Sequence, residues 1–325
     1  MPYRVFVTRH LTHEAEKKLN AFCDPEYWPE DTPPPSNVLL EKTRTADGII
    51  CLLTDPIDAH IINQAKNLKI ISQVAVGVDN IDLAAATEKG IPVGHTPDLL
   101  TDATADMAFT LILAAARRLG EAINYAREGH WQTWGLTTLL GQSVHGANLG
   151  IIGMGRIGQA VAKRARGFDM TIQYTSRSPK PAIEKAFGAT RLPLDELLKT
   201  SDIISLHVPL TEETHKLIGK AQFKIMPSHA ILVNTARGGV VDTSALVKAL
   251  KTDQIGYAAL DVTDPEPLPA SHELYQRPNA LIVPHIGSAT HTARNAISLL
   301  AVDNLIAGLQ GLPLLKSPNQ SKIIG

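Results

Sequence analysis

The chain has 325 residues, of which 44% are hydrophobic, and a formal net charge of −1 at pH 7. This length is more than one hydrophobic core usually organises, so two domains are expected. The balanced charge gives no global electrostatic reason to bind nucleic acid or an anionic membrane surface, and no apolar run reaches the ~20 residues that span a bilayer.

The first hundred residues alternate short apolar runs with helical segments. Strands are predicted at residues 3–8, 38–43, 48–53 and 69–74, and helices at 12–22, with Thr12 as the N-cap, and at 58–65. Short apolar strands that alternate with helices are typical of a parallel sheet covered by helices on both faces.

The start of the chain also lacks the apolar core and cleavage site of a signal peptide. Cys23 and Cys51 are too few for a disulfide framework and do not have metal-ligand spacing, so no metal site is expected. Together these features favour a cytoplasmic protein.

An Ala- and Leu-rich helix is predicted at residues 101–119, between two strand–helix series, where it could serve as a hinge or crossover. The second series starts at Asn148, and its further strands are predicted at residues 170–175, 203–207, 230–234, 256–260 and 280–283. A final helix at 292–309 is long enough to return to the first domain.

The segment from Asn148 to Gly158 carries the strongest motif. An apolar strand ends in Gly-x-Gly-x-x-Gly, formed by Gly153, Gly155 and Gly158, and a helix is predicted at residues 159–166. The first glycine permits the tight turn, the second lets the backbone approach a pyrophosphate, and the third allows close helix packing. The helix N-terminus offers N–H groups to the anion. This order predicts a dinucleotide site.

The next strand indicates which dinucleotide binds. An acidic residue roughly 20 positions past the first glycine usually binds the ribose of NAD, but Thr175 stands there instead. Ser176, Arg177 and Ser178 follow and can donate hydrogen bonds to a 2′-phosphate. The alternative for Arg177 is a solvated loop arginine. We expect NADPH as cofactor, with NADH bound more weakly.

Three polar residues follow predicted strands of the second series, where open α/β sheets form their ligand sites. Arg237 can hold a carboxylate or carbonyl oxygen, His285 can exchange a proton with an oxygen, and Glu266 can orient the imidazole. Each residue alone is more often structural. Their common placement beside a dinucleotide fold makes them the predicted catalytic trio.

At this point the sequence resembles the D-isomer-specific 2-hydroxyacid dehydrogenase family over nearly its whole length. The matching segments are 74–82 (VAVGVDNID), the glycine motif, 206–211 (LHVPLT), 234–238 (NTARG) and 284–287 (PHIG). Within the family, 174–177 (YTSR) and 131–134 (WQTW) are most similar to glyoxylate/hydroxypyruvate reductases.

The resemblance implies roles for further residues. The resemblance assigns substrate binding to Arg237, His285, Leu52, Val76, Gly77 and Trp134. Cofactor binding falls to the glycine motif and the 176–178 loop together with Thr104, Arg156, Ile157, Val208, Pro209, Thr214, Thr235, Ala236, Asp261 and Gly287.

The resemblance also implies an architecture and a reaction. The fold is α/β, with two Rossmann-like doubly wound parallel-sheet domains. A nucleotide domain at residues 99–290 is inserted into a discontinuous, flavodoxin-like substrate domain at 1–98 and 291–325. The activity is NADPH-dependent reduction of glyoxylate and hydroxypyruvate by a homodimer. Trp134 reaches the neighbouring subunit's active site in this interpretation, whereas its alternative is ordinary packing.

Two other functions remain open from the sequence. One is a sister dehydrogenase that acts on D-lactate, 3-phosphoglycerate or formate, which the absence of an acidic residue at Thr175 argues against. The other is a nucleotide-sensing binding protein without activity, similar to the corepressors that share this fold. The presence of Arg237, Glu266 and His285 favours an enzyme.

Overall fold

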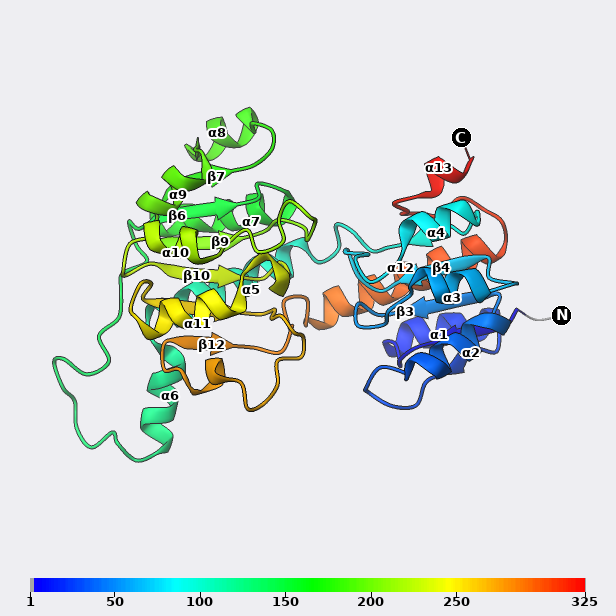
Figure 1. Ribbon diagram of the computed structural model, residues 1–325, viewed down its shortest axis with the longest axis horizontal. Helices are drawn as coiled ribbons and strands as arrows, with labels where there is room; N and C mark the ends of the chain where they lie inside the picture. The colour runs from blue at the N-terminus through cyan, green and yellow to red at the C-terminus, as the bar shows by residue number, and fades with distance from the viewer. Residues whose placement is uncertain (1–2, 325) are drawn as a thin grey trace. The chain divides into compact units, whose positions relative to one another are not determined.

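The computed structural model describes residues 3–324 and divides into two compact units (Figure 1). The discontinuous unit contains the described residues up to Leu100 and those from Ala289 onward, and the continuous unit is Thr101–Ser288. The sequence places the domain boundaries after residues 98 and 290. Residues 1, 2 and 325 of the predicted substrate domain lie outside the described residues. The substrate and nucleotide roles of the two units stay predictions.

The discontinuous unit is built on a five-stranded parallel sheet with the order β2-β1-β3-β4-β5. Its strands are β1 (Val5–Val7), β2 (Glu26–Tyr27), β3 (Gly48–Cys51), β4 (Ile70–Gln73) and β5 (Val93–Gly94). The central strands are buried along their whole length, as expected for a sheet with both faces covered.

Helices cover both faces of this sheet. They are α1 (His13–Phe22), α2 (Ser36–Thr45), α3 (Ala59–Gln64), α4 (Leu83–Glu88), α12 (His291–Leu309) and α13 (Gln320–Ile324). Helices α1 and α12 share one apolar core with β1, β3 and β4, whereas α2, α3 and α4 share the other. The long helix α12, near the end of the chain, therefore packs on the N-terminal strands, as its predicted length suggested.

The continuous unit holds a seven-stranded parallel sheet with the order β12-β11-β10-β9-β6-β7-β8. The strands are β6 (Asn148–Ile152), β7 (Thr171–Thr175), β8 (Thr190–Arg191), β9 (Ile203–Leu206), β10 (Ile231–Asn234), β11 (Tyr257–Leu260) and β12 (Ala280–Ile282). The strand order reverses between β6 and β9. Such a switch point opens a crevice at the carboxyl ends of the strands, which is where α/β sheets bind ligands.

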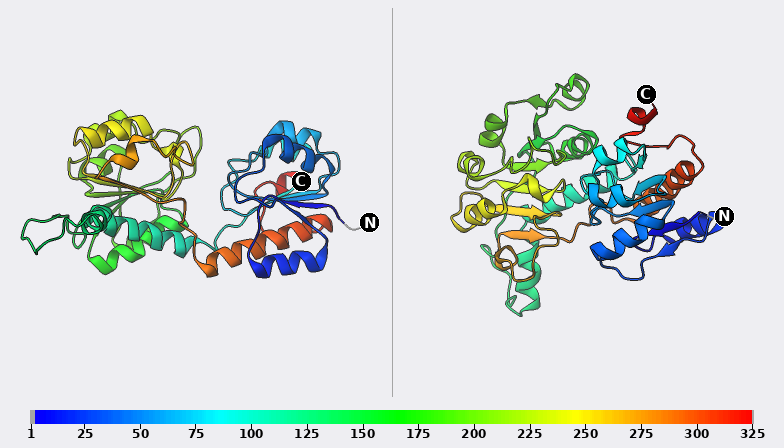
Figure 2. Two further views of the ribbon diagram at one scale, coloured as in Figure 1. Left: turned by 90° about the horizontal axis from the view of Figure 1, so that it is seen from below. Right: turned by 45° about the vertical axis from the view of Figure 1, so that its right-hand side comes forward.

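Two helical layers enclose this sheet as well, and Figure 2 shows both sheets between their layers. The helices are α5 (Thr101–Ala116), α6 (Leu119–Arg127), α7 (Arg156–Ala165), α8 (Pro181–Phe187), α9 (Leu194–Thr200), α10 (Lys220–Ile225) and α11 (Thr243–Lys251), with short 3-10 turns at Arg166–Phe168, Gly238–Val240 and Glu273–Gln276. Helices α5 and α7 pack together on one face, and α9, α10 and α11 cover the other.

One predicted strand is wrong. Residues 38–43 lie within helix α2, which buries Leu39 and Thr43. These residues are four apart, so they share one face of a helix. In a strand they would also share a face, but the residue midway between them would then be buried as well. The run of apolar residues there is too short to distinguish the two periods.

The end of one helix and the side-chain cap of another also differ from the prediction. The helix predicted at 101–119 ends at Ala116, because Arg118 adopts a left-handed conformation (φ 50°), and α6 follows as a separate helix. Thr12 occupies the N-cap position of α1, but its hydroxyl donates to Asn295 Oδ1 (2.9 Å) instead of capping the helix.

The two parallel sheets with flanking helices confirm the predicted α/β fold class. Among the described residues, no helix combines the length and the apolar character that crossing a membrane requires.

Candidate active site

The glycine motif forms a tight turn between β6 and α7. Gly153 has a φ of 102°, which side chains rarely adopt, and its N–H donates to Thr175 O (2.9 Å). A Cβ at Gly158 would lie 2.2 Å from the Gly153 oxygen, so the helix can approach the turn only without a side chain. At Gly155, the N-cap of α7, a Cβ would meet no heavy atom within 4 Å. The turn is thus closely packed at two glycines and open at the one predicted to face a pyrophosphate.

A buried hydroxyl lies after β10. Thr235 is 8% exposed, and its Oγ1 has no hydrogen-bond partner in the described part of the chain. Leaving a buried hydroxyl without a partner is unfavourable. The orphaned group, together with the open space at Gly155, fits a bound dinucleotide at this edge of the sheet.

The loop after β7 is held by side-chain hydrogen bonds. Ser176 Oγ donates to Ser178 O (2.7 Å), which closes the loop on itself. Arg191, on the neighbouring edge strand β8, donates to Ser176 O (2.9 Å) and to Arg177 O (3.3 Å). The Arg177 side chain is exposed, as a phosphate-binding residue must be before its ligand arrives. The sequence alone did not single out Arg191.

The loop after β9 contains three predicted cofactor residues. Thr214 Oγ1 donates to Pro209 O (2.6 Å) and accepts from Thr211 N (2.8 Å), so this hydroxyl closes the loop that starts at Val208. His207 precedes the loop and pairs through Nε2 with Ser205 Oγ (2.8 Å). Burial lowers the pKa of His207 to about 4, which keeps its imidazole neutral near pH 7.

The predicted acid–base pair is assembled in the continuous unit. His285 follows β12 with a left-handed backbone (φ 50°), and its Nδ1 lies 2.5 Å from Glu266 Oε1. Glu266 stands in the loop after β11, between two cis X–Pro peptide bonds. Both side chains are about a quarter exposed, so the pair is shielded but reachable. The arrangement leaves Nε2 of His285 to exchange a proton with a ligand.

Asp261, at the end of β11, holds the backbone that follows His285. Its carboxylate accepts from Ile286 N (2.6 Å) and Gly287 N (2.8 Å), and its own carbonyl accepts from His285 N (2.9 Å). Burial raises the pKa of Asp261, and the two amide donors and His285 offset part of that effect. Thr104 of α5 lies against Gly287, so these predicted cofactor residues share one place.

The turn after β10 positions Arg237. Asn234 Nδ2 donates to Arg237 O (2.9 Å), and Asn234 Oδ1 accepts from Ala236 N (3.0 Å). The Arg237 guanidinium donates to Ala236 O (2.9 Å) and is half-buried. The residues predicted from three separate motifs therefore all follow parallel strands of one sheet. Their catalytic roles stay predictions.

Leu52, Val76 and Gly77 belong to the discontinuous unit, where they follow β3 and β4. The carbonyl oxygens of Val76 and Gly77 accept from His95 Nδ1 (2.9 Å) and Gln73 Nε2 (3.3 Å). Neither amide of this pair donates a hydrogen bond within residues 3–324. Adjacent unpaired N–H groups after a strand form a favourable place for an anion.

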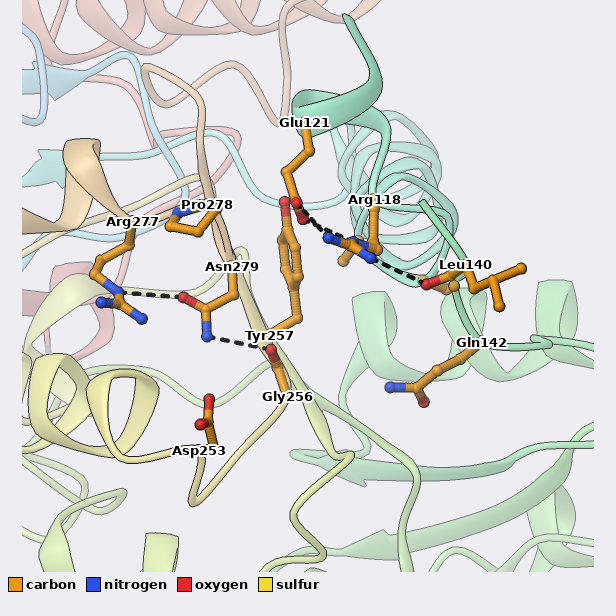
Figure 3. A pocket seen from close by; sticks show the side chains of 13 residues that line it. Arg118, Glu121, Leu140, Gln142, Asp253, Gly256, Tyr257, Arg277, Pro278 and Asn279 are labelled. Carbon is orange, nitrogen blue, oxygen red and sulfur yellow. Dashed lines mark hydrogen bonds and ion pairs between the residues drawn. The ribbon is translucent and has the colours of Figure 1, made fainter. Parts of the chain in front are cut away.

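Trp134 lies outside the strand ends of the continuous sheet. It is 80% exposed, on the long loop that follows α6 and extends away from the sheet of the continuous unit (Figure 1). Near the base of this loop is a cavity of about 360 Å³ (Figure 3). Its wall includes Arg118, paired with Glu121, and Asn279, which accepts from Arg277. This cavity contains none of the predicted catalytic or cofactor residues. No cluster of three or more metal-binding side chains occurs in the described part of the chain.

Comparison with known proteins identifies the family. The sequence profile of the D-isomer specific 2-hydroxyacid dehydrogenase NAD binding domain matches residues 109–287. A glyoxylate reductase from Thermococcus litoralis is 49% identical over 315 residues, which cover 96% of this chain and 95% of the relative.

Solved structures agree with this result. The TT0316 protein from Thermus thermophilus superposes with a TM-score of 0.90 at 48% identity, covering 97% of this chain and 99% of its own. An NADPH-dependent glyoxylate/hydroxypyruvate reductase from Sinorhizobium meliloti, solved with NADP and malonate, has a TM-score of 0.87 at 30% identity and 98% coverage of both chains. These matches confirm the resemblance predicted from the sequence. The chain belongs to the D-isomer-specific 2-hydroxyacid dehydrogenase family and is an NAD(P)-dependent enzyme.

Proposed function

We propose that the protein is an NADPH-preferring reductase of small 2-oxo acids, which converts glyoxylate to glycolate and hydroxypyruvate to D-glycerate. The observation that carries the proposal is the 2.5 Å pairing of His285 Nδ1 with Glu266 Oε1, on the same parallel sheet as a dinucleotide-type glycine turn. The names of the relatives from Thermococcus litoralis and Sinorhizobium meliloti support the same substrate class.

In the proposed mechanism, His285 donates a proton to the oxygen of the substrate's carbonyl group. When bound, NADPH would supply the hydride that the carbonyl carbon of the 2-oxo acid accepts. His285, protonated at both nitrogens, holds Glu266 through Nδ1 and delivers the Nε2 proton to the developing alkoxide. Glu266 stabilises the charged imidazole and fixes its orientation. The product is the 2-hydroxy acid, and the neutral His285 is reprotonated from solvent.

Two further groups bind the substrate in this proposal. The N–H groups of Val76 and Gly77, which have no partner within the described residues, bind the substrate carboxylate. Arg237 binds the carboxylate and polarises the carbonyl oxygen through its fork of charged donors. Such fixed donors lower the barrier because they are already oriented toward the charge that develops.

The cofactor preference rests on the loop after β7. Thr175 puts no negative charge where a 2′-phosphate would lie, and Ser176, Arg177 and Ser178 offer donors to it. Arg191 supports this arrangement, because its guanidinium binds the carbonyl oxygens of Ser176 and Arg177. Carbonyl oxygens repel phosphate, so their neutralisation favours an anion at this loop.

The homodimer is supported by the exposed loop after α6. Large apolar side chains gather there, with Trp134 80% and Leu136 77% exposed, and such a concentration is typical of a protein interface. A second cavity of about 500 Å³ lies between α6 and the Tyr275–Ile282 region, with Tyr257, Pro278 and Leu281 in its wall. We assign this surface to a second copy of the chain, whose own apolar loop would supply the complementary side chains.

A substrate panel tests the function. Loss of NADPH absorbance is measured with glyoxylate, hydroxypyruvate, pyruvate and 3-phosphohydroxypyruvate, and again with NADH. We expect the first two acids with NADPH to give the highest kcat/KM. Heat protection by NADPH without turnover of any acid would contradict the proposal and identify a nucleotide-binding protein instead.

Replacement of the proposed acid tests the mechanism. His285→Ala should lower kcat/KM by about 10²–10⁴-fold, because it removes the proton donor, while the Kd for NADPH stays within about twofold. His145→Ala is the control, since His145 is an exposed histidine that precedes β6 and so lies at the amino edge of the sheet. Full activity of His285→Ala would refute the mechanism.

A further inference from the structure

Buried polar side chains lie at the carboxyl edge of the sheet in the discontinuous unit, next to the Val76–Gly77 loop. Asp55 and Gln73 are both 0% exposed, and the proposed reaction uses neither of them. Burial of a carboxylate and an amide is costly unless their hydrogen bonds are satisfied. The hydrogen-bond partners of these two side chains therefore indicate what role they have at this edge of the sheet.

The Asp55 carboxylate connects the ends of two strands. Oδ2 accepts from Thr8 Oγ1 (2.5 Å), after β1, and from Leu52 N (2.7 Å), after β3. Oδ1 lies 3.3 Å from the guanidinium of Arg9, which is itself 7% exposed. The position of Leu52 is thus fixed by a buried ion pair and not by packing alone.

Asn80 connects this group to the loop after β4. Its Nδ2 donates to Leu52 O (3.0 Å) and Asp55 O (2.8 Å), and its Oδ1 accepts from Gln73 Nε2 (2.7 Å). Gln73 Nε2 also donates to Gly77 O (3.3 Å). One side chain therefore ties the segment that carries Leu52 to the segment that carries Gly77.

Hydrogen bonds within the unit also occupy both carbonyl oxygens of the loop. Gly77 O is bound by Gln73, and Val76 O is bound by His95 Nδ1 (2.9 Å). A carbonyl dipole that faced a carboxylate would repel it, whereas the two unpartnered amides attract it. The network can thus determine how well the loop binds an anion.

We propose that Asn80 is a positioning residue for the 2-oxo acid: it sets the spacing of Leu52 and Gly77 and orients the Val76–Gly77 amides toward the substrate carboxylate. This inference rests on the proposed function, since it assumes that these amides bind the substrate. Asn80 does not touch the substrate and acts through Gln73 and the two backbone segments.

The test compares substrate binding with cofactor binding. Asn80→Ala removes the side-chain hydrogen bonds to Leu52, Asp55 and Gln73, and Asn80→Asp keeps the shape but places a carboxylate against two carbonyl oxygens. For both variants we expect the KM for glyoxylate and the Kd for oxalate, a non-reacting dicarboxylate, to rise about tenfold or more, because small displacements of positioning groups are costly. The KM for NADPH should change by less than about twofold.

Asn319→Ala is the matched control. Asn319 belongs to the same unit, is 2% exposed and makes a similar set of bonds, to Val93 N, Ile91 O and Thr87 Oγ1. These partners lie at the amino end of β5, away from the loop. Its replacement should lower the melting temperature without raising the KM for glyoxylate or the Kd for oxalate.

The outcomes separate the inference from the proposed function. If Asn80→Ala and Asn80→Asp bind oxalate as tightly as the wild type, or if Asn319→Ala weakens oxalate binding equally, the positioning role is refuted. If the wild type binds oxalate but does not reduce glyoxylate, the proposed reaction is refuted, and weaker oxalate binding in the Asn80 variants still supports the role of Asn80.

Discussion

In the proposed cofactor site, the side chains after β7 set the charge that faces the ribose. Arg177 is exposed, and Arg191 binds the backbone carbonyls of the same loop, so positive charge is concentrated where a 2′-phosphate would bind. Arg177→Asp replaces an attractive charge with a repulsive one. We expect the ratio of kcat/KM for NADPH to kcat/KM for NADH to fall by at least about tenfold.

Lys185→Asp provides the control for this prediction. Lys185 is an exposed residue of α8, so its replacement changes the net charge equally but lies outside the 176–178 loop. The ratio should then stay within about twofold of the wild-type value. An unchanged cofactor ratio in Arg177→Asp would contradict the assignment of this loop to the 2′-phosphate.

Residues within motifs could be predicted from the sequence, whereas those that act through the backbone could not. His285 and Glu266 were predicted because their chemistry is visible in their residue types, and the structure places them 2.5 Å apart. Asn80 and Arg191 bind carbonyl oxygens of residues that are distant in the sequence, such as Leu52, 28 positions before Asn80. A carbonyl acceptor exists at every residue, so no sequence pattern marks the partner.

At the scale of an element, we expect alanine to have different effects on stability at two glycines of the turn from β6 to α7. A Cβ at Gly158 would lie 2.2 Å from Gly153 O, so Gly158→Ala should lower the free energy of unfolding by about 1–3 kcal/mol. A Cβ at Gly155 meets nothing within 4 Å, so Gly155→Ala should cost less than about 1 kcal/mol.

Gly155→Ala, the variant that costs less stability, is the one that should weaken cofactor binding. The methyl group of Gly155→Ala occupies the space assigned to the pyrophosphate, so the Kd for NADPH should rise about tenfold or more. Urea unfolding and NADPH titration of both variants check this pair of expectations. Tight NADPH binding by Gly155→Ala would show that the pyrophosphate does not approach this turn.

The end of β9 should make the stability of the protein depend on pH. The pKa of His207 is lowered by burial to about 4 in the folded protein, from 6.5 in the unfolded chain. Between these values the unfolded chain binds more protons, so the contribution of His207 to stability is complete above pH 6.5 and is lost as pH falls. At pH 5 this loss amounts to about 2 kcal/mol.

Urea unfolding at pH 7.5 and pH 5 measures this effect. His207→Gln removes the titrating group, so its free energy of unfolding should fall by about 2 kcal/mol less than that of the wild type over this interval. His145→Gln should behave as the wild type, because His145 is exposed. Equal pH dependence in the wild type and in His207→Gln would exclude His207 as the source.

How well a helix or strand could be predicted depends on its length and on how clearly its apolar residues repeat. Six of the seven strands of the continuous sheet were placed within one or two residues, because apolar runs such as β9 and β10 alternate with clear turns. The two-residue edge strand β8 was not predicted, because it is too short to show a period. Helix α2 was mistaken for a strand because its buried face consists of little more than Leu39 and Thr43. Helix α5 was predicted to run to residue 119, past its end at Ala116, because nothing in the sequence marks the left-handed Arg118. Helix α6, which follows, was not predicted.

At the scale of the whole molecule, the chain carries almost no net charge and one loop with several exposed apolar side chains. The large apolar residues of this loop are Trp131, Trp134, Leu136 and Leu140. A monomer would leave them all in water, at a cost of roughly 25 cal/mol for each Å² of apolar surface. The low net charge adds little electrostatic repulsion between copies.

These properties predict a homodimer whose interface includes the loop. Light scattering should give twice the chain mass of 35.0 kDa, and the double variant Trp134→Asp, Leu136→Asp should shift the species to the chain mass. Leu312→Asp is the control, because Leu312 is also exposed (53%) but belongs to the discontinuous unit. Trp134→Ala then tests whether this side chain reaches the partner's active site: a dimer with a raised KM for glyoxylate would support that role, and a dimer with unchanged kinetics would show that Trp134 only packs. A double variant that remains a dimer would place the interface elsewhere.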